Sequence, residues 1–553
     1  MSLTLALNSA TSSLRTIQSE LALASNNIAN ADTEGYTVKS ATKVSTTTGG
    51  GGIGTGVDIT GITSKVDANL LKTIVAATSD NAEAATTDSY LDLLGDILGQ
   101  LSSGDSSDTI AASLSELQAT FEELAATPES ETLKTQAVLQ LADVAAGLRD
   151  VSTQVQELRA QADAEIETAV DGINDSLHAI DALNDSIVQA RARGQSTADL
   201  EDQRMVLVAA LAEQINVSYY TDDSGAMTLY SGGQPLLNSS VHELSYQASG
   251  TVTSETVYPG GFDAITLNGV DITNSLKSGS LAALVELRDD TLVDVQDSLD
   301  AIATDLTYQF NTLGNSGSAL PAPSTLTGTL EGLSGTDALS ATGTLSVAVT
   351  NADGSAVSVT EIDLTTVSSV DDLLSQLNAI SGVSASLDAN GQLVVATTDS
   401  TTGVALSGGS IGGETVSAHF GMNDLLSGDG AEDLYIRADI AADPSLLAVA
   451  TLGDDGLSLS GGALSQAMAD AIDTDAAADL VAEVAAQATA AASAATAKQT
   501  TLTTLTDTFS SRYGVNIDEE TARVSELENA YSASAQVLSA IQEMFDSLLN
   551  AVS

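Results

Sequence analysis

Both ends of the chain carry one narrow hydrophobic seam and no second apolar face nearby to cover it. Near the start, apolar or alanine positions alternate in steps of four and three residues, which is a strict heptad. The first seam comprises Leu3, Leu7, Ala10, Leu14, Ile17, Leu21, Ala24 and Ile28. The second comprises Val524, Leu527, Tyr531, Ser534, Leu538, Ile541, Phe545, Leu548 and Val552, with Ser534 as its polar exception. The spacing predicts an amphipathic helix at each end.

These two helices bury too little apolar surface to be stable by themselves. Each large seam residue contributes roughly 1.5–3 kcal/mol when buried, and each end has about five or six of them. Ordering about 30 residues costs roughly 1–2 kcal/mol per residue in backbone entropy, and hydrogen bonding offsets only part of that. Each helix therefore needs a partner, which is the other terminus, a neighbouring copy of the chain, or both. The alternative is two ordinary amphipathic helices on a globular domain.

The charge of the chain excludes several classes of function. Its 553 residues contain 75 acids and 17 bases, which gives a formal net charge of −58. Nucleic acids and anionic membrane surfaces both recruit clustered Lys and Arg, so we expect neither among the partners. We interpret the acidity as a solvated surface that keeps copies soluble and mutually repelled, with a saline habitat as a second explanation.

Reactive side chains are scarce. The chain has no Cys, so a disulfide or a thiolate site is excluded, and three isolated His (His178, His242 and His419) leave little for a metal site. No apolar run reaches the length that crosses a bilayer. The first residues lack a basic segment before the apolar ones, so we expect no standard secretory signal. These features alone would indicate a cytoplasmic protein.

Between the two seams, helical and strand-like segments alternate. A helix expected over residues 138–192 would be about 80 Å long if unbroken, and Pro128 is expected in a first helical turn. Hairpins are expected around Asp353-Gly354 and Asn390-Gly391. The predicted fold class is α+β, mainly α. We expect a discontinuous elongated helical rod, formed by paired N- and C-terminal coiled-coil helices and a central helical bundle, with inserted β-rich outer domains.

The expected domain division follows these changes of pattern. It comprises a terminal coiled-coil assembly core (1–66 and 500–553), a helical rod (67–214, 276–319 and 420–499), a small β-rich domain (215–275) and an inserted β-rich outer module (320–419).

Two short motifs that can carry chemistry lack the surroundings they require. Residues 49–54 fit G-x-G-x-x-G, but dinucleotide binding needs a strand before the motif and a helix after it. Residues 408–412 fit G-x-S-x-G around Ser410, with His419 nearby, but we expect no helix to follow. No acidic cluster has the spacing of a calcium loop. We therefore expect no catalytic residue, no cofactor and no metal, and we predict that the chain is not an enzyme.

The polar segment SNNIANADTEGYT, residues 25–37, ends the first seam abruptly. It resembles the N-terminal signature of the flagellar axial proteins, which comprise rod, hook and hook-associated proteins. Asn side chains bond backbone groups where a helix ends, and Gly accepts a positive φ. Helix, stop and returning strand are therefore expected to form one packing unit. The matching residues are Asn26, Asn27, Asn30, Gly35, Tyr36 and Thr37.

The C-terminal segment 513–550 narrows the resemblance to the hook–filament junction branch of that family. Internal blocks that agree are IGTGVDITGI, LEDQRMVLVAAL around Asp202, and GSLAALVELRDD from Gly279. Residues 320–415 depart from the pattern and are more similar to a small insert module of some flagellins and hook-associated proteins. The matching C-terminal residues are Gly514, Val515, Asn516, Ile517, Asp518, Glu519, Glu520, Tyr531, Ala535, Val537, Leu538 and Met544–Asp546.

This resemblance implies a structural component of the bacterial flagellum that joins hook to filament as a polymerised adaptor ring. It implies as partners other copies of the chain, the hook protein, the next hook-associated protein towards the filament, and a flagellar export chaperone. It also implies an extracellular location, reached through the flagellar type III exporter without a cleaved signal peptide, which replaces the cytoplasmic interpretation. The expected assembly interface consists of Leu3, Leu7, Leu14, Ile17, Leu21, Ile28, Val524, Leu527, Tyr531, Leu538, Ile541, Phe545 and Leu548.

Three alternatives remain at this point. The chain could be another axial protein, such as the filament-proximal hook-associated protein or the hook subunit, although the GVNIDEE block and the length favour the junction branch. It could be a secreted acidic adhesin or surface-layer protein, which would bind divalent cations or a surface. An enzyme reading rests only on the match around Ser410.

Overall fold

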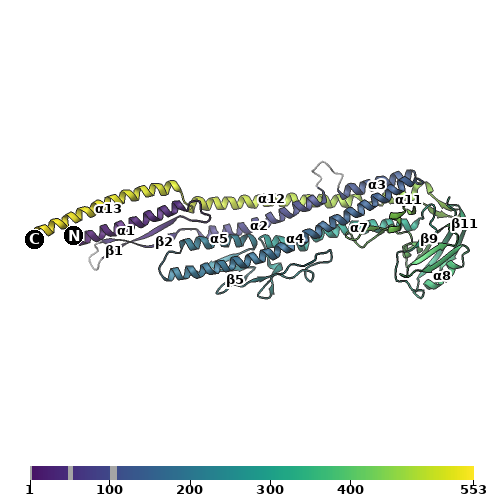
Figure 1. Ribbon diagram of the computed structural model, residues 1–553, viewed down its shortest axis with the longest axis horizontal. Coiled ribbons are helices and arrows are strands. Elements are labelled where there is room, and N and C mark those ends of the chain that lie inside the picture. The colour runs from purple at the N-terminus through teal and green to yellow at the C-terminus, as the bar shows by residue number, and fades with distance from the viewer. Residues whose placement is uncertain (1–2, 48–53, 100–108, 553) are drawn as a thin grey trace.

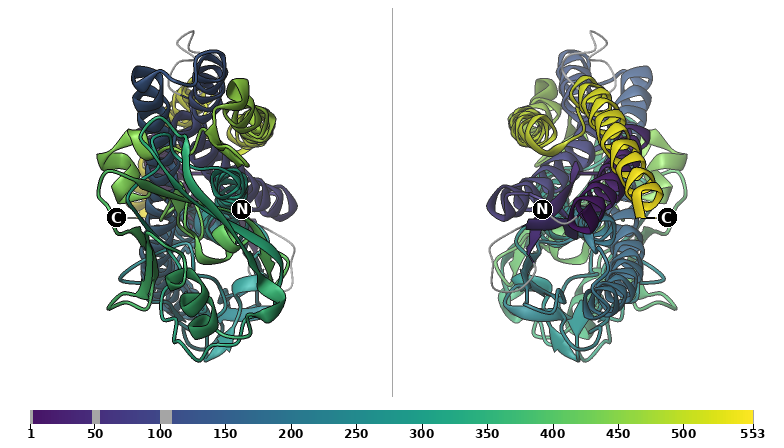
Figure 2. Two further views of the ribbon diagram at one scale, coloured as in Figure 1. Left: turned by 90° about the vertical axis from the view of Figure 1, so that its right-hand side faces the viewer. Right: turned by 90° about the vertical axis from the view of Figure 1, so that its left-hand side faces the viewer.

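The computed structural model describes residues 3–47, 54–99 and 109–552, with side chains described as far as Asn550. The molecule is an elongated rod with both termini at one end and a β-rich module at the other (Figure 1). We call the end with the termini proximal and the opposite end distal. The long helices run along the rod, as the two end-on views show (Figure 2). This confirms the predicted class, a mainly helical α+β chain with an elongated helical rod.

The two terminal helices lie side by side at the proximal end (Figures 1 and 2). Both helices predicted from the seams are confirmed, and an antiparallel hairpin packs on the first of them. The elements of this terminal core are α1 (Leu3–Ala29), β1 (Lys39–Thr47), β2 (Gly54–Ser64) and α13 (Ile517–Val552).

The rod is a bundle around the 62-residue helix α4, which is about 93 Å long at 1.5 Å per residue. Helix α4 begins at Glu131, earlier than predicted, because the Ser130 side chain caps it by accepting a hydrogen bond from Leu133 N. Pro128 lies in the turn before this cap, so its expected place in a first helical turn is wrong. The rod helices are α2 (Ala68–Leu98), α3 (Ile110–Ala126), α4 (Glu131–Ala192), α5 (Ala198–Gln214), α6 (Ser280–Glu286), α7 (Leu292–Ser316), α11 (Ala463–Asp470) and α12 (Thr474–Tyr513), with the π-helical turn η3 (Leu287–Thr291) between α6 and α7.

The apolar stripe of α4 supplies the core along the whole rod. In its distal half Leu148 and Val155 belong to a cluster with Phe121 of α3 and Phe310 of α7, whose rings meet edge to face at 5.3 Å. In its proximal half Ile173 joins a second cluster with the residues of a small β-rich segment. A single helix therefore connects both cores, which suits a stiff rod.

The small β-rich segment lies against the flank of α4 and shares its core. The buried carboxylate of Asp163 on α4 fixes it there: it accepts from the Tyr246 hydroxyl and from Ser249 N of the segment, and Arg288 of the rod donates to it at 2.8 Å. Its strands form two antiparallel sheets, β3 (Ser218–Thr221), β4 (Met227–Ser231) and β5 (Gln234–Leu237), then β6 (Leu244–Ser245), β7 (Thr266–Leu267) and β8 (Val270–Asp271), before the 3₁₀ turn η2 (Thr273–Ser275).

The distal module contains two three-stranded sheets and a short helix around one apolar core. Both predicted hairpins are confirmed, with Gly354 and Gly391 at positive φ in their turns. The sheet orders are β11-β10-β14 and β12-β13-β9. The elements are β9 (Thr325–Thr327), β10 (Ala341–Thr350), β11 (Ala356–Asp363), η4 (Leu364–Thr366), α8 (Val370–Asn378), β12 (Val383–Leu387), β13 (Leu393–Thr397), β14 (Gly403–Ile411) and α9 (Val416–Phe420).

The chain returns to the rod through short elements, of which the first four pack on α4 or α7, the hairpin β17–β18 packs on strands of the distal module, and η6 packs on α3 and α11. They are β15 (Leu426–Ser427), β16 (Tyr435–Ile436), α10 (Ala438–Ala442), η5 (Pro444–Leu446), β17 (Thr451–Gly453), β18 (Gly456–Ser458) and η6 (Ser460–Gly462).

Candidate assembly core at the paired termini

The two predicted seams face each other within one chain. Polar contacts also join the helices: Ser13 and Ser534 place their hydroxyl oxygens 3.4 Å apart, and Gln18 Nε2 donates to the Tyr531 hydroxyl at 3.3 Å. Of the expected interface residues, only Ile17 and Ile541 are buried, and Leu548 is exposed. The half-buried ones are Leu3, Leu7, Leu14, Leu21, Ile28, Val524, Leu527, Tyr531, Leu538 and Phe545. One chain therefore covers its own seams only in part.

Large apolar side chains also lie outside the seam on α13. Val537, Met544 and Leu549 are exposed to 54, 49 and 65%. Two grooves flank the helix pair, one of about 880 Å³ between α1, the hairpin and Leu538, and one of about 420 Å³ on the side of Val537. The heptad pattern did not predict this second apolar face of α13, because its residues fall between the seam positions.

A second face of α1 packs on the hairpin, and its buried residues are largely polar. Thr16, Glu20 and Asn27 are buried there beside Leu23. The Glu20 carboxylate forms an ion pair with Lys43 of β1 at 2.8 Å. Sequence reasoning missed this face since its polar residues look like a solvated one.

The signature turn after α1 is held by its asparagines. Asn30 Nδ2 donates to Asn26 O at 2.9 Å, which closes the end of the helix. Asn27 is bonded on both sides of its amide: Nδ2 donates to Lys39 O at 3.0 Å, and Oδ1 accepts from Lys39 N at 3.2 Å and from the Tyr36 hydroxyl at 2.9 Å. The predicted unit of helix, stop and returning strand is therefore confirmed as a packed structure.

Gly35 and Tyr36 pack this turn against the rod. Gly35 has φ +71°, and a Cβ there would lie 2.4 Å from Val206 Cγ2 of α5, so both the backbone and the packing require glycine. Burial, and then the negative charges of Asp199, Asp202 and Glu520, raise the pKa of Tyr36 to about 12. Tyr36 therefore stays neutral at physiological pH.

Asp202 of α5 is the centre of the connection between terminal core and rod. It accepts from Thr37 N at 2.8 Å and from Thr37 Oγ1 at 2.9 Å, and it forms an ion pair with Lys39. The Lys39 side chain is buried, and its ammonium also lies over the Tyr36 ring at 4.5 Å. Two residues further along α5, Arg204 donates to Asn184 Oδ1 and to Gly225 O, each at 2.7 Å.

The C-terminal signature forms the joint between α12 and α13. Gly514 ends α12, and a Cβ there would lie 2.5 Å from Ser510 O. Asn516 Oδ1 then accepts from Asp518 N at 3.1 Å and from Glu519 N at 3.3 Å, which caps α13. The acids of this first turn also favour the positive end of the helix dipole. The side chains of Val515 and Ile517 stay half-buried and exposed, respectively.

Three family models match the chain in the same order as these features. "Flagella basal body rod protein" matches residues 7–37, "Flagellar hook-associated protein FlgK helical domain" matches 97–327, and "Flagellar basal body rod FlgEFG protein C-terminal" matches 507–551. Flagellar hook-associated protein 1 of Escherichia coli is 24% identical over 98% of this chain and 99% of its own length. The chain is similar to flagellar hook-associated protein 1 over almost its whole length. It is thus a structural component of the bacterial flagellum.

Two further comparisons agree with the family. Flagellar hook-associated protein 1 of Salmonella typhimurium is 25% identical over 55% of this chain and 55% of its own length. The solved structure of the flagellar hook junction protein FlgK from Burkholderia pseudomallei matches with a TM-score of 0.50 at 15% identity, over 79% of this chain and 99% of that chain. This last likeness concerns the fold.

The motifs considered for catalysis lie in ordinary structural surroundings. Gly49 and Gly51 lie outside the described residues, and Gly54 begins strand β2. Ser410 lies within strand β14 opposite Thr342 of β10, so it is not at a strand-to-helix elbow. The expectation that no helix follows it is wrong, since the one-turn helix α9 caps itself through Thr415. Among the described residues, no group of His, Cys, Asp and Glu has metal-ligand geometry, and no helix is long and apolar enough to span a bilayer.

The three histidines lie far from one another in the sequence and have separate partners. His178 Nε2 lies 2.7 Å from the Glu243 carboxylate, His242 Nδ1 lies 3.2 Å from Asn268 Oδ1, and His419 Nδ1 lies 3.8 Å from the Glu414 carboxylate. Each histidine therefore has a local structural contact, and the three do not form a common site.

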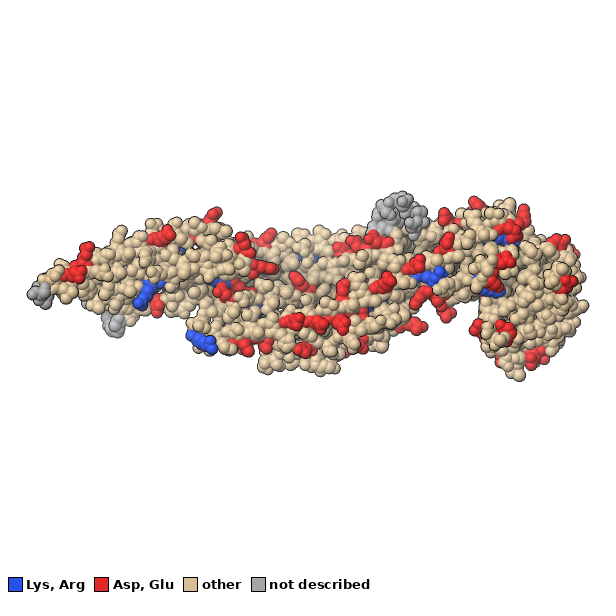
Figure 3. All heavy atoms as spheres, in the orientation of Figure 1, with Lys and Arg blue, Asp and Glu red and all other residues tan. Residues whose placement is uncertain are grey.

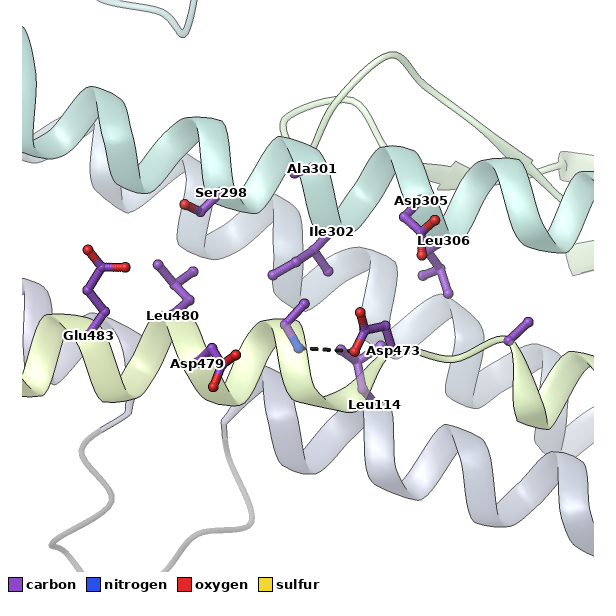
Figure 4. A pocket seen from close by; sticks show the side chains of 12 residues that line it. Leu114, Ser298, Ala301, Ile302, Asp305, Leu306, Asp473, Asp479, Leu480 and Glu483 are labelled. Carbon is purple, nitrogen blue, oxygen red and sulfur yellow. Dashed lines mark hydrogen bonds between the residues drawn. The ribbon is translucent and has the colours of Figure 1, made fainter.

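A hollow of about 420 Å³ lies in the distal part of the rod, between α7, α12 and α3 (Figure 4). Ile302, Leu306 and Leu480 line it, with carboxylates around them from Asp305, Asp473, Asp479 and Glu483. Asp473 is engaged as the N-cap of α12 through Asp475 N and Ala476 N. The described lining residues include no His, Lys or Arg, so the hollow offers carboxylates on an apolar floor and no paired catalytic groups.

Proposed function

We propose that this protein joins the flagellar hook to the filament as a polymerised adaptor ring, with the terminal core as its assembly interface. The observation that carries the proposal is the incompletely covered helix pair α1–α13, with half-buried seams and large exposed apolar residues on α13. Contiguous exposed apolar surface marks an interaction site. The names of the relatives, hook-associated protein 1 and hook junction protein, support the place in the flagellum.

In this proposal the half-buried seam residues of one copy become fully buried by packing against those of neighbouring copies. A free copy gains little from ordering its terminal helices, whereas a copy at an existing end gains the surface of its neighbours. Polymerisation then starts only at an existing end of the flagellum, and free copies do not polymerise in solution. The signature residues around Asn27 and Asn516 set the angle at which the helix pair leaves the rod.

The partners follow from that position. As a flagellar component the protein belongs to the part of the flagellum outside the cell, and it assembles with other axial proteins. We infer that the hook protein lies on one side and the next hook-associated protein on the other, and that an export chaperone holds the chain before export without a cleaved signal peptide. We also infer that the protein is not an enzyme. We propose that the chain is divided into a terminal coiled-coil assembly core, a helical rod, a small β-rich domain and a β-rich outer module, with the bounds predicted from the sequence.

The test uses isolated hooks with bare distal ends, to which purified protein is added before the decorated ends are counted by electron microscopy. The wild type should decorate only the distal end and should be needed before flagellin adds. Ile541→Asp, at a buried seam position, should abolish decoration, and Ser539→Asp, at an exposed position of the same helix, should not. Decoration by Ile541→Asp at the wild-type level would overturn the interface, and bare hooks with the wild type would overturn the junction function.

A further inference from the structure

The negative charge of this chain is unevenly distributed. Residues 1–66 contain equal numbers of acids (Glu20, Asp32, Glu34, Asp58) and bases (Arg15, Lys39, Lys43, Lys65). The net charge of −58 therefore comes from the remaining residues, and acidic side chains follow the rod and the distal module on the face shown in Figure 3. Two such copies repel each other, so they can pack closely only through surfaces with few acids.

Helix α12 passes from an acidic part to an acid-free part along its length. Its start presents Asp479 and Glu483 to the hollow of Figure 4. From Val484 to Thr506 it contains no Asp or Glu, and its one charged residue is Lys498, which pairs with Asp80 of α2 at 2.7 Å. Most of these residues are exposed. A long exposed stretch without acids stands out in a chain with 75 of them, and depletion of charge is the mark of an interface centre.

A groove of about 750 Å³ runs between this part of α12 and α2. Leu98, Val481 and Val484 form its buried floor. Its α12 wall consists of small side chains, which let another helix approach closely, and Asp92 of α2 is the one acid among the described lining residues. The lining residues from α12 beyond the floor are Ala485, Ala488, Thr489, Ala492, Ser493 and Thr496.

We propose that the α2–α12 groove receives a helix of a second copy of this chain, as a contact along the rod in addition to the terminal core. The inference rests on the proposed function, because it concerns the same ring. The charge distribution favours a second copy as the occupant: a copy with a net charge of −58 meets less repulsion at this groove than at the acidic faces of the rod and the distal module. The helix that forms one wall of the groove also leads through Gly514 into α13 of the terminal core, so a contact at the groove and a contact at the terminal core lie along the chain's C-terminal helices. In a closed ring such a contact is head-to-tail, so the groove meets a different face of its neighbour.

A single acid placed in the groove tests the proposal. Ala492→Glu introduces a charge on the groove wall, and Glu is a good helix former, so α12 should keep its structure. Ala389→Glu, at an exposed position in the turn of the distal module, is the matched control. We expect at least about tenfold fewer decorated hook ends for Ala492→Glu, because the charge would be buried without a partner. The control should decorate like the wild type, and both should show wild-type circular dichroism.

Cross-linking identifies the occupant directly, since the natural chain has no Cys. Ala492→Cys labelled with a benzophenone maleimide should form, on illumination of decorated hooks, an adduct of two copies joined through a rod peptide. An adduct with hook protein alone would overturn the proposal, as would decoration by Ala492→Glu at the wild-type level. In both cases decoration by the wild type would leave the proposed function standing. Bare hooks with the wild type would instead overturn both.

Discussion

Asp202 fixes the N-terminal signature to the rod across a sequence separation of 165 residues from Thr37. Replacing it by Asn leaves the buried Lys39 ammonium without its nearest counter-charge. We expect Asp202→Asn to lower the free energy of unfolding by about 3 kcal/mol, since an unpaired buried charge is costly. Chemical denaturation, with hydrogen exchange at residues 37–47, measures the effect.

Asp199 provides the matched control for this prediction. Its carboxylate lies 3.8 Å from Lys39 Nζ and its side chain is 67% exposed. Asp199→Asn should therefore cost less than about 1 kcal/mol. If the two variants lost equal free energy of unfolding, the close contact between Asp202 and Lys39 would contribute nothing beyond that of the distant Asp199.

Tyr36 makes the same joint sensitive to alkaline pH. Its pKa is raised to about 12, first by burial and then by Asp199, Asp202 and Glu520, whereas an unfolded tyrosine titrates near 10. The folded state therefore favours the neutral phenol, so this stabilisation is complete below about pH 10 and is lost as the pH rises towards 12. Comparing the pH dependence of unfolding in the wild type and in Tyr36→Phe isolates this contribution. Equal dependence over that window would contradict it.

At the scale of elements, the sequence predicts those helices and hairpins that depend on a local residue pattern. The heptads at residues 3–28 and 524–552 predict both terminal helices, and Asp-Gly and Asn-Gly predict both hairpins of the distal module. The polar face of α1 was not predictable in this way, because Glu20 and Asn27 are buried through tertiary contacts, which Glu20 makes with Lys43 and Arg523 and Asn27 makes with Lys39. The exposed Val537 and Met544 matched the family pattern, but their spacing alone assigned them no role.

A substitution at the N-cap of α13 tests whether the C-terminal signature stabilises the start of this helix. Asn516 Oδ1 accepts from two backbone N–H groups at the start of α13. Asn516→Ala should therefore destabilise this helix by about 1 kcal/mol and speed hydrogen exchange in its first turns. Asn516→Asp keeps the cap and is the matched control. Unchanged exchange in the Ala variant would mean that packing on α1, and not the cap, fixes the start of α13.

At the scale of the whole molecule, rod length and charge were readable from the sequence, whereas the relation between distant segments was not. Most of the 62-residue helix α4 follows from the apolar periodicity over residues 138–192, whereas its start at Glu131 does not. The meeting of α12 with α2 brings together residues about 400 positions apart, and only the folded chain shows that an acid-free stretch lines a groove. Repulsion between copies therefore acts mainly on the rod and the distal module, while the neutral residues 1–66 carry no such penalty.

This distribution of charge predicts that assembly depends on salt. Between about 10 and 150 mM NaCl the Debye length falls from about 30 Å to about 8 Å, which screens the repulsion between neighbouring rods. Contacts through the terminal core and the α2–α12 groove are largely apolar and keep their strength. The number of decorated hook ends at a fixed protein concentration should therefore rise over this range, and a matched osmolality of sucrose should not reproduce the rise. A fall with salt would instead show that attraction between the acidic surface and a basic partner governs docking.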